Sequence, residues 1–409
     1  MNLPFAPIKQ FVSVLILCSL GATLGCRRND FPDTPTGYRE FAYVSNGGAN
    51  TVSVLDLVYL RPDRTLQVGS QPSGMAVNPV KDEVYVVNSA SGTVSVIDTD
   101  KNAVVATIGV HKLPYFISVD AAGRRAYVAN SGSNTVSVID LDRRREIAVA
   151  GTGEEPGLAR IAPDMRSLVV TNRGSGSISI FGVDQTDPAN TPKQQSQPLH
   201  LRTAFPGCPG ATDAAILPDS SKAFIACSGG HQIMAINLAA APDSWAAKQN
   251  PSLMTDRILA MLDVGETPVH LAMKPDGGEI FVSNFGSGTI SEISTYTNEV
   301  GSTYPIGKQP VHGLVSGDNS ALWVANFGAD SLSLYSIDDG KLVSSLRTGS
   351  APDVLAFSAD EHLLLAADAH SGDVSVIRTQ SKLGPSLFTI LPAGASPNAI
   401  VIKAIPAKN

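Results

Sequence analysis

The sequence predicts an all-β fold built from one repeated antiparallel unit, and three observations carry this prediction. A phrase of two short strands around a Gly, Ser or Asn turn recurs eight times between residues 42 and 377. The residues that close the first strand of each phrase are spaced 42, 42, 42, 55, 57, 42 and 42 apart. The chain also has 36 Gly and 27 Pro among 409 residues, which suits a fold with many turns between short strands.

Each phrase is predicted to be a β-hairpin because β-branched and small residues alternate on both sides of its turn. The clearest copies are AYVSNGGANTVSVLDL from Ala42, VYVVNSASGTVSVID from Val84 and AYVANSGSNTVSVID from Ala126. Two further strands separate the hairpins: one resembles 104–108, and the other follows a Gly-x-x-Pro turn, as at 265–268. Four short strands in each repeat are typical of a β-propeller blade.

The number of blades follows from the order of the strands. Counted from the ring axis outward, the chain opens on the second strand of a blade and closes on an innermost strand at 397–402. We therefore predict a single propeller over 41–404, with eight four-stranded blades and a tail at 405–409. Pairing of the C-terminal strand with the N-terminal blade would hide the last sheet edge. Seven blades would result if one unit failed to form.

The phrases carry a family resemblance. Tyr-Val-x-Asn followed by Thr-Val-Ser-Val-Ile-Asp resembles the YVTN family of β-propeller repeats, which occurs in microbial surface and envelope proteins, and the resemblance covers residues 42 to about 402. Units five and eight depart from it, with Cys227 and Asp368 in place of Asn. We interpret the Asn as structural, because its side chain can bond the backbone of a turn and it tolerates left-handed geometry.

The N-terminus is predicted to be an export signal. The apolar stretch 11–25 is shorter than the roughly 20 residues of a membrane-spanning helix and fits a secretory signal. It ends in Thr-Leu-Gly-Cys, which resembles the bacterial lipobox, whose cysteine is lipidated. We predict a lipoprotein signal peptide at 1–25, lipidation of Cys26 and a tether at 26–40. The alternative is an ordinary signal peptide cut nearby, with Cys26 incidental.

The predicted export signal and lipobox imply a lipoprotein of the bacterial cell envelope. It would face the periplasm or the cell surface and be held to the membrane through its lipid alone. Cys18 would leave with the signal and Cys26 would take the lipid, so Cys208 and Cys227 remain. A leftover pair in an exported chain is a candidate disulfide.

Charge and motifs exclude several functions. The formal net charge is −7, and the longest basic run is 143–145, so the chain lacks the footprint of a nucleic-acid binder. The sequence has no Cys-x-x-Cys-His, His-Glu-x-x-His or Gly-x-Ser-x-Gly motif. No cofactor is predicted, and we expect a monomer.

The repeat breaks at two long spacings, which add 13 and 15 residues around 185–197 and 239–255. Both fall between the third and the outer strand of a blade, and such connections share one face of a propeller. Long insertions on one face of a repeat protein often mark a binding face. Tolerated surface decoration is the alternative.

Four residues form the candidate ligand-binding site. His270 and His312 begin successive innermost strands in Pro-Val-His repeats 42 residues apart. Arg160 and Asp213 stand near the same register on the two preceding innermost strands. Together they could bind a small anion or a metal ion at the channel mouth. Alternatively, each histidine only satisfies a backbone carbonyl between blades, and no third metal ligand with characteristic spacing appears.

These observations lead to one function and two alternatives. The leading hypothesis is a lipid-anchored envelope propeller that acts as a non-catalytic platform for an envelope protein or a small ligand. The first alternative is a lactonase-like hydrolase with its site at the channel mouth; its catalytic residues are unknown. The second is a propeller that binds haem d1 or a quinone. Both alternatives are analogies at the level of the fold.

Overall fold

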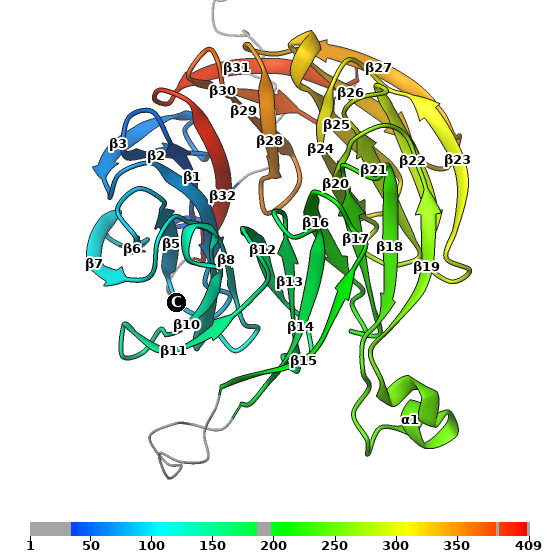
Figure 1. Ribbon diagram of the computed structural model, residues 1–409. Coiled ribbons are helices and arrows are strands. Elements are labelled where there is room, and N and C mark those ends of the chain that lie inside the picture. The colour runs from blue at the N-terminus through cyan, green and yellow to red at the C-terminus, as the bar shows by residue number, and fades with distance from the viewer. Residues whose placement is uncertain (1–33, 186–197, 382–383, 407–409) are drawn as a thin grey trace, which may run out of the picture. The chain divides into compact units, whose positions relative to one another are not determined.

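The predicted ring of eight blades is confirmed in the computed structural model of the protein, which describes residues 34–185, 198–381 and 384–406. In these residues the strands form eight four-stranded antiparallel sheets, arranged as blades around one axis (Figure 1). The predicted signal peptide, Cys26, most of the tether and most of the first insertion lie outside the described residues.

The strands fall into four layers, counted from the ring axis outward. Each blade consists of four consecutive strands, except that the first blade takes its innermost strand, β32, from the C-terminal end of the chain. The innermost strands are β4 (Pro72–Val77), β8 (Pro114–Val119), β12 (Pro156–Ile161), β16 (Ala211–Ile216), β20 (Pro268–Met273), β24 (Pro310–Val315), β28 (Pro352–Phe357) and β32 (Pro397–Ile405). The second strands are β1 (Arg39–Asn46), β5 (Glu83–Asn88), β9 (Arg125–Asn130), β13 (Ser167–Asn172), β17 (Lys222–Cys227), β21 (Glu279–Asn284), β25 (Ala321–Asn326) and β29 (Leu363–Asp368).

The third strands are β2 (Thr51–Asp56), β6 (Thr93–Asp98), β10 (Thr135–Asp140), β14 (Ser177–Val183), β18 (Gln232–Asn237), β22 (Thr289–Ser294), β26 (Ser331–Ser336) and β30 (Asp373–Arg378). The outer strands are β3 (Arg61–Gln67), β7 (Ala103–Gly109), β11 (Arg145–Gly151), β15 (Leu199–Pro206), β19 (Arg257–Asp263), β23 (Glu299–Pro305), β27 (Lys341–Arg347) and β31 (Ser386–Pro392). The helical segments are α1 (Trp245–Gln249) and the 3-10 turns η1 (Ser131–Ser133), η2 (Pro251–Met254) and η3 (Phe327–Ala329).

The ring closes as the strand count predicts. The C-terminal strand β32 pairs with β1 in antiparallel register, so that Ala42 lies opposite Ile402 and Val44 opposite Ile400. This pairing completes the first blade with a strand from the far end of the chain. β1 is therefore paired on both sides, and β32 leaves unpaired only the edge that faces the ring axis, as every innermost strand does.

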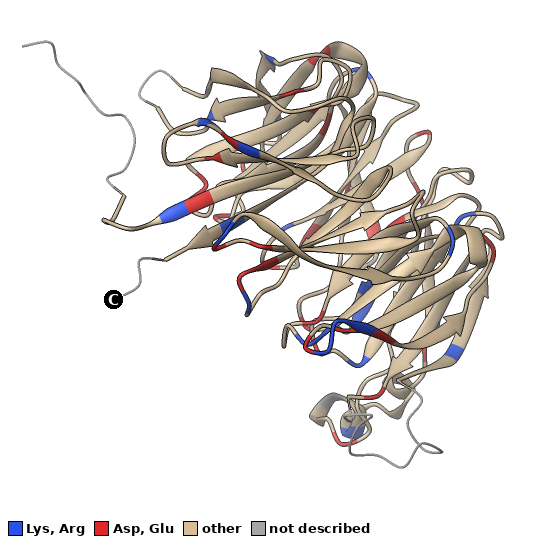
Figure 2. Cartoon of the chain, turned by 90° about the vertical axis from the view of Figure 1, so that its left-hand side faces the viewer, with Lys and Arg blue, Asp and Glu red and all other residues tan. Residues whose placement is uncertain are grey.

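The core lies between the blades, where the second and third strands bury both of their faces. Tyr43, Val54, Val84 and Ile97, for example, pack together from the first two blades. Outer strands alternate between exposed and half-buried residues, as in β7. Figure 2 shows that charged residues gather mostly at strand ends and loops. The sheets are therefore held together by apolar surface removed from water.

The repeated asparagine is structural, but in a different way from the one predicted. In the second blade, Asn88 is fully buried, and its Nδ2 donates to Thr93 Oγ1 at 3.1 Å and Ser95 Oγ at 3.0 Å on the third strand. The backbone φ of its counterpart Asn130 is −104°, so that residue is extended. The left-handed positions lie four residues later in each hairpin, as at Asn134. The asparagine therefore ties two strands together below the turn.

Both insertions connect a third strand to an outer strand, and the described one carries α1 and η2. Figure 1 shows α1 projecting away from the ring. Its base is held by Asp256, whose Oδ1 accepts from Ala239 N at 2.8 Å and from Arg202 Nη2 of the neighbouring blade at 2.8 Å. In the described part of the chain, no helix is long and apolar enough to cross a membrane.

Candidate functional site

The fold brings the four predicted site residues into one row on adjacent blades. Arg160, Asp213, His270 and His312 lie on β12, β16, β20 and β24, four successive innermost strands. Asp213, His270 and His312 are each the third residue of a strand, and Arg160 is the fifth of its own. Equivalent positions line up around a propeller, so one substitution in each blade is enough to build a continuous polar row. We call these four residues the polar row.

Asp213 is the centre of the polar row. Its Oδ1 accepts from Ala214 N at 2.8 Å and lies 3.5 Å from Arg160 Nη2. Its Oδ2 accepts from Leu271 N at 2.9 Å and lies 3.8 Å from His270 Nε2. The side chain is only 10% exposed, so these contacts replace most of its hydration. Asp213 thus orients the arginine on one side and the histidine on the other.

The two histidines form a stacked pair. Their ring centroids are 4.0 Å apart with an interplanar angle of 31°. His270 Nδ1 accepts from Gly313 N at 3.2 Å, so the proton of a neutral His270 sits on Nε2, toward Asp213. Within the described residues, the buried Nδ1 of His312 has no hydrogen-bond partner. Neither Nδ1 donates to a backbone carbonyl between blades, which was the alternative role weighed for this pair.

The environment keeps both imidazoles neutral. Burial lowers the pKa of His270; Asp213 opposes this shift and Arg160 adds to it. Burial also lowers the pKa of His312, well below its ordinary value, and the neighbouring His270 and Arg160 act in the same direction. A neutral imidazole offers one donor and one acceptor. The row therefore holds one cation, one anion and two neutral hydrogen-bonding groups.

Arg160 is the most accessible of the charged groups in the row. Its side chain is 37% exposed, against 10% for Asp213 and 22% for the neutral His270. The guanidinium carbon lies 5.7 Å from the ring centroid of Phe116, on the preceding innermost strand. The ring restricts the guanidinium while leaving some of its donors in contact with solvent. A carboxylate or phosphate group approaching the ring axis would meet a pre-oriented cation.

The polar row fits an anion better than a metal ion. In the described ranges, no group of three or more His, Cys, Asp and Glu residues is placed to hold a metal. Both oxygens of Asp213 already accept backbone hydrogen bonds, and Arg160 would repel a cation. We therefore derive no metal-dependent chemistry from these residues.

The predicted disulfide is confirmed and supports the start of the strand that carries Asp213. Cys208 and Cys227 are bonded, with Cα atoms 4.7 Å apart, and both are fully buried. The bond joins the loop before β16 to the end of β17 in the same blade. Cys227 stands where the regular units have Asn, and its disulfide ties the second strand to the entry of β16 and not to the third strand.

Two features of the site region escaped sequence reasoning. Asp353, the second residue of β28, is a half-buried carboxyl whose pKa is raised by burial. It was missed because only the third and fifth positions were compared.

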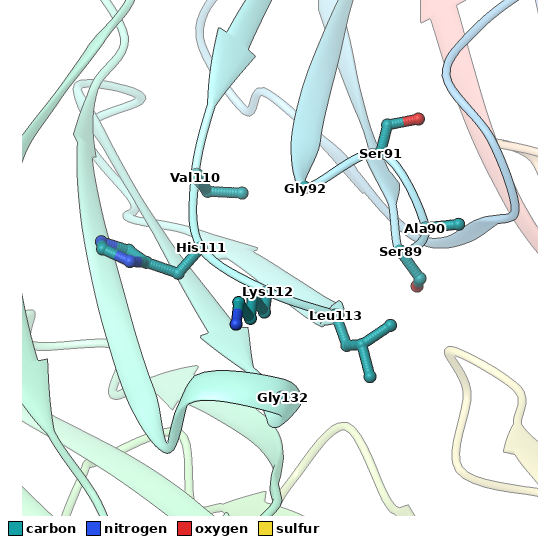
Figure 3. Close-up of a pocket in the computed structure, with 9 residues that line it drawn as sticks. All are labelled: Ser89, Ala90, Ser91, Gly92, Val110, His111, Lys112, Leu113 and Gly132. Carbon is teal, nitrogen blue, oxygen red and sulfur yellow. The ribbon is translucent and has the colours of Figure 1, made fainter.

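On the face that carries the hairpin turns, which we call the upper face, a cavity of about 550 Å³ opens between the second and third blades (Figure 3). The sequence feature that could have pointed to this cavity is His111, which occupies a position where most repeats have Gly.

The fold and the polar row define a β-propeller protein with an accessible ionic site on its innermost strands. A family model described as "Lactonase, 7-bladed beta-propeller" matches residues 42–152 and 307–388, less than half of the chain. The matched segments include His312 and leave out the rest of the polar row. This chain has eight blades where that description has seven. No curated protein gives a significant match.

Solved structures share the fold. Dihydro-heme d1 dehydrogenase NirN, solved in complex with DHE, is 15% identical over 91% of this chain and 76% of its own, with a TM-score of 0.69. Hydrazine synthase of Kuenenia stuttgartiensis is 20% identical, with coverages of 82% and 92% and a TM-score of 0.53. A Bacteroides fragilis protein to which 6-phosphogluconolactonase activity is ascribed is 15% identical, with coverages of 92% and 100% and a TM-score of 0.58. At these identities the likeness concerns the fold alone.

Proposed function

We propose that the protein is a lipid-anchored propeller of the bacterial cell envelope that binds a small acidic ligand through the polar row. The observation that carries this proposal is the placement of Arg160, Asp213, His270 and His312 on four adjacent innermost strands. At the third and fifth positions of the other innermost strands the residues are uncharged. A half-buried ionic group on an innermost strand needs a function or a partner, because its desolvation is costly.

The charge state of the row favours the binding of an anion. Both histidines are held neutral by burial, and Asp213 is engaged by two backbone amides as well as Arg160. Arg160 keeps exposed donors and is braced by Phe116. This arrangement recognises a carboxylate or phosphate by charge-assisted hydrogen bonds.

Calorimetric titration tests the proposal. The intact protein is titrated with acetate, succinate, citrate and inorganic phosphate, and Arg160→Gln is compared with Arg145→Gln, a matched control on the exposed start of β11. We expect Arg160→Gln to weaken binding of the responsive acid about tenfold or more, since a hydrogen bond to a charged group is lost. Equal affinities of the two variants would refute a role for the row.

Lactone hydrolysis is the second candidate, and the partial match to the lactonase family model favours it. The assay is a panel of lactones with and without a chelator, using His270→Gln and His312→Gln as variants. A rate that these substitutions abolish would replace the binding proposal by a catalytic one. A visible absorption band in the protein purified from its native host would instead support the haem d1 or quinone hypothesis.

The membrane anchor and the projecting insertion complete the proposal. Acylation of Cys26 predicts that Cys26→Ala moves the protein from the membrane fraction to the soluble fraction.

Trp245 on α1 is 77% exposed, which suits a contact with an envelope partner. Deleting 240–254 should then remove that partner from affinity captures of the native envelope while the propeller still folds. An unchanged set of captured proteins would restrict the function to ligand binding.

A further inference from the structure

The upper face repeats one local structure eight times. Where an outer strand leads into the next innermost strand, two residues precede the first residue of the new strand, as Ser70 and Gln71 precede β4. The second of the two has a left-handed φ in every repeat: Gln71 52°, Leu113 47°, Glu155 49°, Gly210 62°, Thr267 55°, Gln309 54°, Ala351 58° and Ser396 54°. Successive N–H groups that end in a left-handed residue form a concavity that accepts anions, called a nest. Seven of the eight copies can form such a nest, because Pro209 in the remaining copy has no backbone N–H.

Four of these nests are filled by the protein itself. The first N–H of each donates to a serine of the same blade: Ser70 to Ser91, Glu154 to Ser175, Glu266 to Ser287 and Ser350 to Ser371. The second N–H donates to a left-handed residue of the preceding blade: Gln71 to Asn50, Glu155 to Asn134, Thr267 to His231 and Ala351 to Asp330. Each nest of this kind thus holds two side-chain acceptors, which shows what chemistry its amides take.

The nest of Lys112 and Leu113 lacks both acceptors. The left-handed residue of the preceding blade is Gly92, with φ 64° and no side chain. Ser133, at the serine position, bonds Asn130 O and Thr135 Oγ1 instead. Neither N–H of this nest meets an acceptor anywhere in the described ranges. Two convergent backbone donors are therefore left open.

A cavity lies directly on these donors. Its volume is about 550 Å³, and its lining comprises residues 89–92, 110–113 and Gly132. Figure 3 shows the 111–113 loop facing the turn that carries Ser91 and Gly92. The exposed Lys112 has no carboxylate within ion-pair distance in the described part of the chain, whereas His111 Nε2 lies 3.4 Å from Glu146 Oε2. The cavity therefore combines two free amides with an uncompensated ammonium group.

Two of the four copies that follow a left-handed glycine have lysine as their first residue; the other two, after Gly176 and Gly372, have Pro209 and Ala395. Lys308 and Gln309 form a nest that follows the left-handed Gly288, and their N–H groups also have no acceptor in the described residues. In the filled nests, the first residue is serine or glutamate. A lysine beside open amides adds the one charge that favours a bound anion.

We propose that Lys112 and Leu113 form an oxyanion site, which binds the carboxylate or phosphate group of a small ligand seated in this cavity. The two backbone N–H groups bind the oxyanion, and the Lys112 ammonium balances its charge. The ligand's oxygens occupy the places that Asn50 Oδ1 and Ser91 Oγ fill in the preceding nest. This site is on the upper-face loops and is independent of the polar row.

The experiment follows the amide signals of Lys112 and Leu113 in the intact, ¹⁵N-labelled protein during titration with inorganic phosphate and, separately, with sodium acetate. Chloride keeps the ionic strength constant, so that general screening is removed. We expect saturable shifts of both amides. A response to phosphate alone assigns a phosphate ligand, and a response to acetate alone assigns a carboxylate. No saturable shift with either anion overturns the proposal.

Variants make the assignment specific. Gly92→Asn supplies the internal acceptor found at Asn50 and should abolish the shifts, whereas Gly176→Asn is the matched control, with φ 58° and the same place in its hairpin. Lys112→Gln should weaken binding about tenfold, as expected for loss of one charge-assisted contact. Unchanged signals of Ser350 and Ala351, whose nest is filled by Ser371 and Asp330, verify the fold of each variant. Full binding by a folded Gly92→Asn variant would also refute the site.

Discussion

Replacing Asp368 by Asn restores the residue that six other blades carry at this position, and it should make the protein more stable. Asp368 is fully buried, and its Oδ2 accepts from Ser375 N at 3.0 Å and Ser375 Oγ at 2.7 Å. Asp373 lies directly opposite in the hairpin, where the regular units have Thr or Ser. Burial, with Asp373 as the neighbouring acid, raises the pKa of Asp368 to about 7.

The size and sign of the effect follow from this pKa. The shift from 3.8 to about 7 is about three units, and each unit is worth about 1.4 kcal/mol. The folded state holds a proton that the unfolded state releases, so stability is full below about pH 4 and is lost as the pH rises toward 7. Ionised Asp368 therefore costs at most about 4 kcal/mol above pH 7. Asn cannot ionise, and the variant avoids this cost.

The assay is urea unfolding at pH 4.5 and pH 8, followed through the fluorescence of Trp323, which is buried on β25 in the neighbouring blade. Asp368→Asn should gain about 1 kcal/mol at the lower pH and up to about 4 kcal/mol at the higher one. The exposed Asp243→Asn is the control for loss of one negative charge. An equal gain at both pH values, or none at pH 8, would refute the raised pKa of Asp368.

Further substitutions test other parts of the fold by the same unfolding assay. Replacing Cys208 and Cys227 by Ser removes a crosslink over a sequence separation of 19 and should cost about 3 kcal/mol; no change on reduction would contradict a role in stability. Asn88→Ala deletes two buried hydrogen bonds and should cost about 2 to 3 kcal/mol. Asp256→Ala removes the acceptor for Arg202 and Ala239 N. It should speed proteolysis within 238–256 before global unfolding, whereas equal cleavage of the wild type would show that the insertion is held by other contacts.

The architecture was predictable because each repeat has the same pattern of strands and turns. The hairpin alternation, the constant spacing of 42 and the opening on a second strand, near Ala42, together determine the ring and its closure. The polar row was predictable for the same reason, since equal registers in adjacent blades are neighbours in space. The disulfide between Cys208 and Cys227 followed once other uses of cysteine had been assigned.

Contacts between blades were not predictable at the level of single atoms. The bond from Gln71 N to Asn50 Oδ1 spans 21 residues and depends on left-handed backbone at both ends. The bonds of Asn88 to Thr93 and Ser95 need the hairpin register, which places these residues on facing strands. The orientation of His270 is set by Gly313 N of the next blade. The bonds of Gln71 and His270 depend on how two blades meet, and those of Asn88 depend on the register within one hairpin. A strand pattern encodes neither.

The repeat makes its exceptions informative, because each blade has seven structural controls in the same chain. A glycine at position 92, as at the same place in three other blades, leaves out the acceptor that Asn50 and Asn134 provide. The cost of the two unpaired amides of Lys112 and Leu113 is offset only by solvent or by a ligand. An aspartate at 368 forgoes the stability that Asn gives elsewhere. Such residues lower the stability of the free protein. Binding sites are therefore to be sought at positions where another blade carries a residue that would be more stable there.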